Sequence, residues 1–299
     1  MLPVNLCPIP SLYQARGAAR RERVWIDPFA RPEELRASLR DMDDGYLALL
    51  DALGFRARVA REPQWVERYC DCVESAAKSV SLDYLVFSDS IILTVNGKGD
   101  ESLFKLAQAC SRLMGLLLGE EIGVRGAISQ GSFFRKQVHE STFVAGPAVI
   151  EAYEFELRQN WTGVMLAPSV IRAVPDLMET CLLHHGHFAS LLGDKLALER
   201  EAFIQPCRIP FHDERRLETH PYDGLAVVAT SGATAPNELR DSIGKAVRDL
   251  ERLKAIAPGP KEQAKHQEAV VWHRRIQAKW SDVAGMMAGE VRVSAPLER

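Results

Sequence analysis

The chain has 299 residues, of which 46% are apolar and 26% charged, so its length suits two domains or one large domain with additions. Its 37 basic and 40 acidic residues give a net charge of −3, which argues against a wide basic surface for nucleic acid or for an anionic membrane. A local phosphate-binding site, which needs only a few donors, fits this balance.

No segment has the pattern of a secretion signal or of a membrane span. The first 24 residues are interrupted by prolines and charges, and apolar patches such as 114–118 are far shorter than the roughly 20 residues of a spanning helix. The six cysteines lack the spacing of a disulfide scaffold or of a zinc ribbon. We therefore expect a cytoplasmic protein with reduced thiols that binds neither membrane nor nucleic acid.

From residue 45 to residue 167, apolar runs of strand length alternate with stretches of helical period. In chain order they predict a strand at 45–50, a helix at 64–80, a β-hairpin at 84–95, a helix at 101–119, a strand at 123–131, a helix at 146–158 and a strand at 162–167. This order predicts an α+β ferredoxin-like palm with a mostly antiparallel sheet rather than a doubly wound sheet.

The two ends of the chain are predicted to be additions to this palm. Residues 1–44 are expected to form an N-terminal arm interrupted by prolines, with one short helix at 33–41. Residues 175–235 should continue the central domain, 45–235, as strands and loops. From 236 to 299, two long helical segments separated by Pro258-Gly259-Pro260 predict a C-terminal helical hairpin.

Two aspartates are expected at the ends of deeply buried strands. Asp51 follows the apolar run at 45–50, and Asp89 lies at the tip of the predicted hairpin. If central strands bring the two carboxylates together, their repulsion is removed by a divalent cation, and oxygen ligands favour Mg²⁺ or Mn²⁺. The alternative is that Asp89 is a turn residue and Asp51 a helix N-cap.

The segment after Asp51 could bind phosphate. Leu53-Gly54-Phe55-Arg56 turns away from the strand, and its glycine allows backbone amides to approach an anion closely. Arg56 and Arg58 add positive charge nearby. Taken alone this signal is weak, because arginines usually solvate a surface.

These residues resemble the class III nucleotidyl cyclases. The segment YLALLDALGF (46–55) is similar to the first catalytic strand of that family, and FSDSIIL (87–93) to the hairpin with its second metal aspartate. VRGAISQG (124–131) and GPAVIEAYEFE (146–156) follow in the family's order. Within the family, these motifs and KHQEAVVWHRRI (265–276) resemble the bacterial pyrimidine cyclases of Pycsar anti-phage systems.

The resemblance implies that residues 45–235 form a cyclase catalytic domain acting as a cytoplasmic homodimer, with sites at the interface. Its substrate would be UTP, or less favourably CTP, and the cyclic monophosphate would act on a separate effector during phage infection. Two divalent cations, Mn²⁺ or Mg²⁺, would be bound by Asp51, Asp89 and the carbonyl of Ala52. The phosphates would lie against backbone amides around Leu53, Gly54 and Phe55, beside Arg56.

This chain departs from the purine cyclases at four positions. Ile150 and Glu154 stand where those enzymes carry a transition-state Asn and Arg, and Leu85 and Pro147 stand where they carry base-reading side chains. We therefore favour a pyrimidine nucleotide cyclase. An inactive module that binds nucleotide and dimerises, or a purine cyclase with unusual base readers, are the alternatives.

The sequence allows two roles for Arg125 and predicts positions for several histidines. Arg125 could add positive charge to the nucleotide site or form a surface or dimer ion pair. His266 and His273, seven residues apart on a predicted helix, are expected to pack or to be solvated. The cluster His184-His185-x-His187 is expected to lie in a loop or at the surface. The role of His139-Glu140 is left open.

Overall fold

The computed structural model describes residues 42–138, 141–177, 202–213, 218–230, 232–233 and 235–287. These residues lie in one compact unit, which begins at Met42. The helix expected at 33–41, the dipeptide His139-Glu140 and the histidines at 184, 185 and 187 lie outside the described residues.

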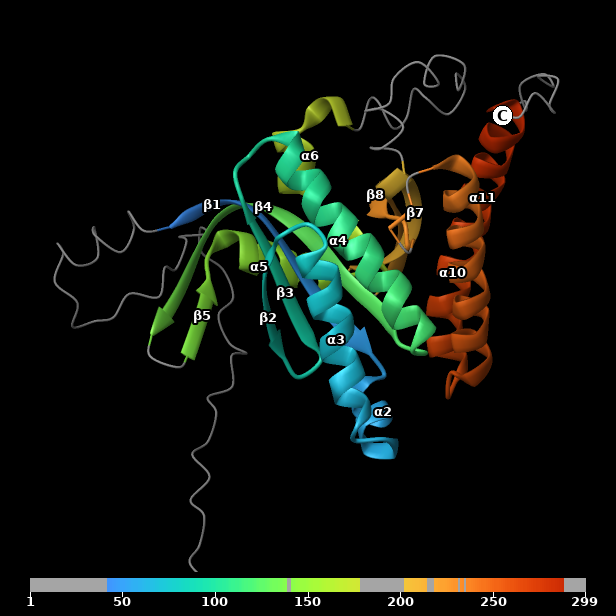
Figure 1. Cartoon of the computed structure of the whole chain (residues 1–299), viewed down its shortest axis with the longest axis horizontal. Coiled ribbons are helices and arrows are strands. Elements are labelled where there is room, and N and C mark those ends of the chain that lie inside the picture. Colours follow the sequence, from blue (N-terminus) through green and yellow to red (C-terminus); the bar gives the residue numbers. More distant parts are fainter. Residues whose placement is uncertain are drawn as a thin grey trace, which may run out of the picture. The chain divides into compact units, whose positions relative to one another are not determined.

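The described strands form one mixed sheet (Figure 1). They are β1 (Asp43–Leu53), β2 (Asp83–Phe87), β3 (Ser90–Asn96), β4 (Gly123–Val138), β5 (Ser141–Ala145), β6 (Gly163–Leu166), β7 (Ile204–Asp213) and β8 (Glu218–Val227). The order across the sheet is β2-β3-β1-β4-β6-β8-β7, with β5 added beside β4. Among these strands, β4 and β6 pair in parallel and the other neighbours are antiparallel.

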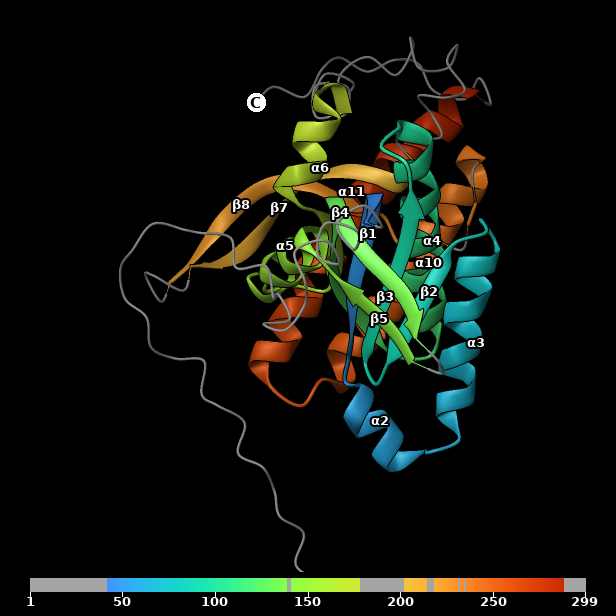
Figure 2. The same ribbon diagram turned by 90° about the vertical axis from the view of Figure 1, so that its left-hand side faces the viewer.

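Helices cover both faces of the sheet. They are α2 (Phe55–Arg61), α3 (Trp65–Lys78), α4 (Asp100–Gly119), α5 (Pro147–Leu157), α6 (Pro168–Ala173), α10 (Pro236–Ile256) and α11 (Pro260–Met287). The long helices α3 and α4 lie on one face and α5 on the other (Figure 2). The last two helices, α10 and α11, pack against each other as a hairpin. This confirms the predicted α+β class, the mostly antiparallel sheet and the C-terminal helical hairpin.

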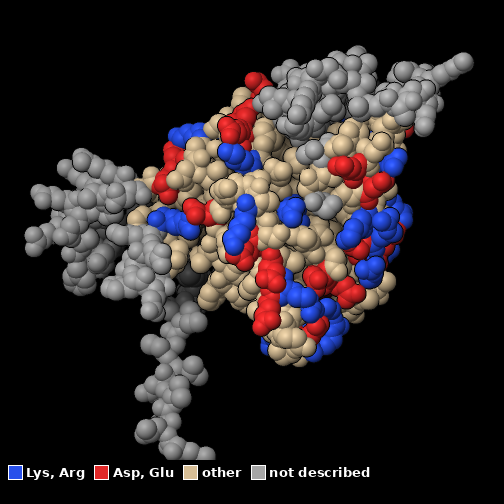
Figure 3. Space-filling view, in the orientation of Figure 1, with Lys and Arg blue, Asp and Glu red and all other residues tan. Residues whose placement is uncertain are grey.

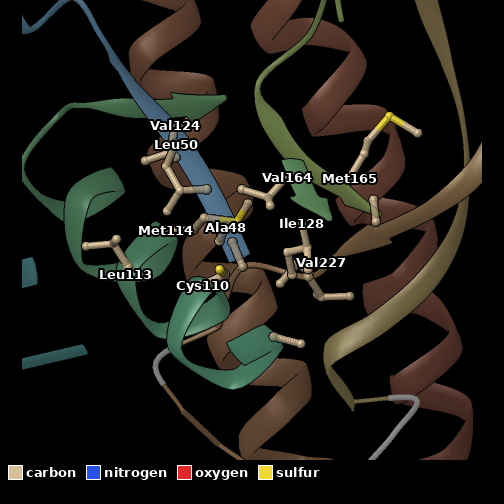
Figure 4. Packing of buried hydrophobic residues seen from close by; sticks show 14 of the residues in the cluster. Ala48, Leu50, Cys110, Leu113, Met114, Val124, Ile128, Val164, Met165 and Val227 are labelled. Carbon is tan, nitrogen blue, oxygen red and sulfur yellow. The ribbon is translucent and has the colours of Figure 1, made fainter. Parts of the chain in front are cut away.

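The main core lies between the sheet and α4 (Figure 4). Side chains alternate between the two faces of a strand, so Ala48 and Leu50 of β1 point to the same side. There they pack with Cys110, Leu113 and Met114 of α4. All five side chains are buried, and at about 25 cal/mol per Å² of apolar surface this layer is a major source of stability.

Several elements differ from the sequence prediction. The short elements α2, β5 and α6 were not predicted, and β4 has 16 residues because it continues beyond β1 to pair with β5. The expectation that the first strand of the 84–95 hairpin is deeply buried was wrong. Its strand β2 pairs with β3 alone, at the edge of the sheet, and the side chain of Phe87 is 79% exposed.

Charges of both signs are mixed on the surface that Figure 3 displays, where Lys and Arg lie among Asp and Glu over the described residues. In the described part of the chain, no helix combines the length and the apolar character needed to cross a bilayer. The four cysteines of that part, Cys70, Cys72, Cys110 and Cys207, are free thiols.

The two histidines of α11, His266 and His273, are buried in the protein. Of the two positions expected from the sequence, packed or solvated, the structure shows the packed one. The Thr162 hydroxyl bonds to the Nδ1 atom of His266 at 2.8 Å. The backbone amide of Ala229 donates to Nε2 of His273 at 3.1 Å, and Nδ1 of His273 donates to the Ala269 carbonyl at 2.9 Å. His273 is therefore held neutral, with its proton on Nδ1.

Acid should destabilise the fold through His273. Burial lowers the pKa of His273 to about 4, below the roughly 6.5 of an unfolded chain. The unfolded state therefore binds the proton first as the pH falls, so stability from this group is complete above about pH 6.5 and is lost between 6.5 and 4. The loss should be about 3 kcal/mol.

Urea unfolding of wild-type protein and of His273→Gln from pH 7.5 to pH 4 would measure this loss. The variant should lose most of the pH dependence in that range, whatever its stability at pH 7.5. Part of the slope should persist, because the pKa of His266 is also lowered, by burial first and then by Lys265. Equal slopes for the two proteins would contradict this assignment.

Candidate active site

The register of the sheet brings Asp51 and Asp89 together. Asp51 lies near the end of β1, opposite Ser90 of β3 and Arg125 of β4. Asp89 lies in the tight turn between β2 and β3, where Ser88 adopts a left-handed conformation with φ of 58°. The backbone amide of Ala52 donates to the carbonyl of Asp89 at 2.9 Å, which fixes this turn against the end of β1.

These positions decide between the two interpretations of Asp51. Gly54, and not Asp51, is the N-cap residue of α2, so the side chain of Asp51 does not cap a helix. Asp89 does lie in a turn, but one that places it beside Asp51. Asp51 and Asp89 therefore lie where both carboxylates can bind the same ligand at this end of the sheet.

Asp51 lies in an environment that disfavours its charged form. Its side chain is 31% exposed, and partial burial raises the pKa of its carboxyl group. Arg125 lowers the pKa, the nearby charge of Asp89 raises it again, and Lys265 lowers it. A cation placed between the two carboxylates would remove both their repulsion and the cost of burying the charge.

Arg125 is held on the same face of the sheet as Asp51. Its Nη2 atom lies 3.5 Å from Oδ2 of Asp51, and its Nε atom forms an ion pair with Glu156 of α5. Nη1 donates to the carbonyl of Gln159 at 3.4 Å. The guanidinium therefore links β1, β4 and α5 within one chain, which differs from the expected surface or dimer ion pair.

Glu156 was not predicted as a site residue. Its side chain is 4% exposed and lies on the buried side of α5 with Ala152 and Phe155. Burial raises the pKa of Glu156, while the contacting Arg125 lowers it. The direct contact with a guanidinium identifies Glu156 as the counter-charge of Arg125. The signal in the sequence was a carboxylate at an apolar position of a helix.

The segment after Asp51 forms an open turn. Gly54 has φ of 83°, a left-handed conformation that suits glycine, and no atom lies within 4 Å of the position that a Cβ would occupy. Leu53 ends β1, and the ring of Phe55 packs against Tyr69, 4.9 Å between centroids. The backbone of this turn therefore faces open space beside the two aspartates.

The arginines after this turn differ in their partners. Arg56 is exposed. Arg58 forms ion pairs with Glu62 and Glu121, at 3.4 and 3.2 Å, so its charge is already compensated. The carboxylates of Asp51 and Asp89, the turn at Gly54 and the guanidinium of Arg125 thus lie at one end of the sheet.

The donor set suits a cation that is shared with a phosphate ligand. In the described ranges, no group of three or more His, Cys, Asp or Glu side chains is arranged to bind a metal ion. Mg²⁺ is usually held by one or two carboxylates together with water and substrate phosphates. Two carboxylates beside an open, glycine-containing turn fit that mode of binding.

Helix α5 presents apolar side chains to solvent near this site. Ile150 is 55% and Tyr153 52% exposed, and Leu157 is also exposed. The helix begins at Pro147, directly after Gly146.

The other position at which the sequence departs from the purine cyclases lies on the sheet. Leu85 is half-buried on β2, opposite Ile92 of β3.

Comparison with known proteins gives structural likeness but no match by sequence. No protein-family model matches the chain, and no curated protein matches it.

The solved structures that resemble it include three cyclase domains. The guanylate cyclase domain of RhGC from Catenaria anguillulae in complex with GTP has 11% sequence identity and a TM-score of 0.42, over 62% of this chain and 97% of that chain. A double mutant of the guanylyl cyclase domain of RhoGC from Blastocladiella emersonii has 9% identity and a TM-score of 0.43, over 63% of this chain and 96% of that chain. The adenylyl cyclase CyaB from P. aeruginosa has 10% identity and a TM-score of 0.39, over 62% of this chain and 94% of that chain. At these identities and TM-scores, the likeness does not assign an activity to this chain.

Proposed function

We propose that the chain is a nucleotidyl cyclase that converts UTP, or less favourably CTP, to the 3′,5′-cyclic monophosphate and pyrophosphate. The observation that carries this proposal is the pairing of Asp51 and Asp89 at one end of the sheet, fixed by the bond from Ala52 to Asp89. The negative charges of these two carboxylates repel each other, and an open turn lies beside them. This arrangement suits a metal-assisted phosphoryl transfer.

In this proposal each part of the site has a chemical task. Asp51 and Asp89, with the carbonyl of Ala52, would hold two Mn²⁺ or Mg²⁺ ions. When bound, such ions acidify the ribose 3′-hydroxyl and neutralise charge on the triphosphate. The backbone at Leu53, Gly54 and Phe55 lies against the phosphates, with the exposed Arg56 nearby. The 3′-oxygen attacks the α-phosphorus, the bond to pyrophosphate breaks, and the hydroxyl proton passes to solvent.

The proposed preference for a pyrimidine is supported by the resemblance to the cyclase family, in which the positions of Leu85 and Pro147 carry the base-reading side chains of the purine enzymes. Leu85 and Pro147 lack side-chain donors and acceptors for a base edge. Ile150 and Glu154 likewise offer no positive charge to the transition state. We therefore propose a pyrimidine base, which does not require those purine-reading contacts.

The active form is proposed to be a homodimer with its sites at the interface. The exposed apolar side chains of Ile150, Tyr153 and Leu157 on α5 support this, because a second copy of the chain would remove them from water. We further propose that the protein acts in the cytoplasm in anti-phage defence, where its cyclic nucleotide reaches a separate effector.

An assay of purified protein with each of the four nucleoside triphosphates and Mn²⁺, followed by chromatography of the products, tests the proposal. Cyclic UMP, or a smaller amount of cyclic CMP, is expected. A product from ATP or GTP alone would instead identify a purine cyclase. Nucleotide binding without any product would identify an inactive module. Sedimentation of the same samples should show a dimer, and an active monomer would contradict the proposed assembly.

A further inference from the structure

The site described above contains few positive charges for a triphosphate. Arg125 is occupied by Glu156 and Asp51, and Arg58 by Glu62 and Glu121. Helix α5, which carries Glu156, contains no Lys or Arg. Beside the exposed Arg56, a nucleotide with several negative charges would therefore be bound more tightly with a further cation from another part of the chain.

Lys265 of α11 lies next to this end of the sheet. Its backbone carbonyl accepts a bond from the amide of Thr162 at 3.3 Å, just before β6 begins. The neighbouring His266 bonds to the Thr162 hydroxyl, and a Cβ added at Gly123 would lie 3.3 Å from its ring. The first turns of α11 are thus fixed against the starts of β4 and β6. Arg125 lies on β4, directly opposite Gly163 of β6.

The charge of Lys265 acts on the carboxylates of the site. The backbone of Lys265 is bonded to Thr162, next to the pair that Gly163 and Arg125 form in the sheet, and the charge of Lys265 lowers the pKa of both Asp51 and Glu156. The side chain is half-buried, no ion pair within 4 Å joins its ammonium to a described residue, and the carboxylate of Glu262 acts on it through its charge alone. A partly desolvated cation of this kind is available to an incoming anion.

We propose that Lys265 binds the triphosphate of the nucleotide, so that α11 supplies the cation that α5 lacks. This assignment rests on the proposed cyclase function and names a binding residue for it outside residues 45–235. Because hydrogen bonds to charged groups are among the stronger ones in proteins, loss of the ammonium should weaken nucleotide binding by roughly ten- to a hundredfold.

Calorimetric binding of 3′-deoxyuridine triphosphate in the presence of Mn²⁺ tests the proposal with the full chain. This nucleotide lacks the attacking hydroxyl, so binding is measured without turnover. Lys265→Ala should bind it at least about tenfold more weakly than wild type, and Lys265→Arg should stay within a few-fold because the positive charge is kept. Because no ion pair within 4 Å joins the ammonium to a described residue, all three proteins should unfold cooperatively on heating, with midpoints within a few degrees of one another.

The matched control is Lys261→Ala, which removes an exposed positive charge one turn earlier on the same helix. It should change the affinity by no more than about twofold, since exposed charges act weakly through water. Equal weakening by Lys261→Ala and Lys265→Ala, or unchanged binding by Lys265→Ala, would overturn the assignment of Lys265 alone. If wild-type protein bound no nucleoside triphosphate at all, the proposed function itself would fail, and the role of Lys265 with it.

Discussion

Replacing Asp51 by asparagine is expected to lower the rate of cyclic nucleotide formation by a factor on the order of 1,000 or more, because the amide cannot hold a divalent cation as a carboxylate does. Asp89→Asn should have a comparable effect, and the double variant should be little worse than either single variant, since the two carboxylates act as one unit. Chromatographic rates at saturating UTP and Mn²⁺ would measure these losses.

The same variant should separate catalysis from folding. Burial and the charge of Asp89 raise the pKa of Asp51, so the charged carboxylate is disfavoured in the folded protein. A neutral amide should therefore leave the melting temperature without metal unchanged or higher. Wild-type protein should gain stability from Mn²⁺ and 3′-deoxyuridine triphosphate, whereas Asp51→Asn should not.

Asp44→Asn is the matched control for this experiment. Asp44 lies on the same strand, about 23 Å away along β1, and forms an ion pair with Lys98 at 2.5 Å. This variant should keep its activity within about twofold, because surface ion pairs contribute little. If Asp51→Asn retained a tenth or more of the wild-type rate, the role assigned to the carboxylate would be wrong.

The second large effect is expected at Arg125 and Glu156. Glu156→Gln leaves the guanidinium of Arg125, which is 17% exposed, with Asp51 as its remaining counter-charge, and this change should cost about 2 kcal/mol of unfolding free energy. Arg125→Met should cost a similar amount, because it leaves the carboxylate of Glu156 unpaired. Urea unfolding at neutral pH would measure both.

The double variant distinguishes an ion pair from two independent packing defects. Glu156→Gln with Arg125→Met should cost clearly less than the sum of the single changes, since neither buried charge then remains alone. Glu74→Gln, which breaks an exposed pair with Lys78 on α3, serves as the control and should change the stability by less than about 1 kcal/mol. Additive costs at Arg125 and Glu156 would show that the two charges are not coupled.

The sequence predicted the long elements of the fold better than the short ones. The apolar run that became β1 and the amphipathic stretch that became α4 have clear periods, because each buries a full face. The seven-residue α2 and the five-residue β5 have no such period. They depend on neighbours: Phe55 of α2 packs on Trp65 and Tyr69, and β5 pairs with the extension of β4.

The candidate site could be predicted only in part. Asp51 and Asp89 could be chosen because a carboxylate at the end of an apolar run is unusual, whereas their proximity depends on the register of β1 with β3 and on the bond from Ala52 to Asp89. Glu156 had a weaker signal, its position on the apolar side of a helix, and its role as the partner of Arg125 depends on how α5 packs on the sheet. The position of Lys265 depends on how α11 docks, through Thr162 and through the bond from Trp272 to the Pro206 carbonyl, 2.8 Å. Docking of this kind leaves no local pattern in a sequence.

The docking of α11 also determines how much of the chain must be synthesised before the charge cluster around Asp51 is complete. Domains generally fold as the chain leaves the ribosome. Here β1 can pair with β4 only after β4 has been synthesised, and Lys265, whose charge acts on Asp51, comes later still, on α11. Most of the chain must therefore emerge before the cluster is complete. A nascent or truncated chain ending before α11 would contain both aspartates and still lack the cation that we assign to the triphosphate. If the proposed function is correct, synthesis of α11 would thus determine when the molecule can first bind a nucleotide tightly.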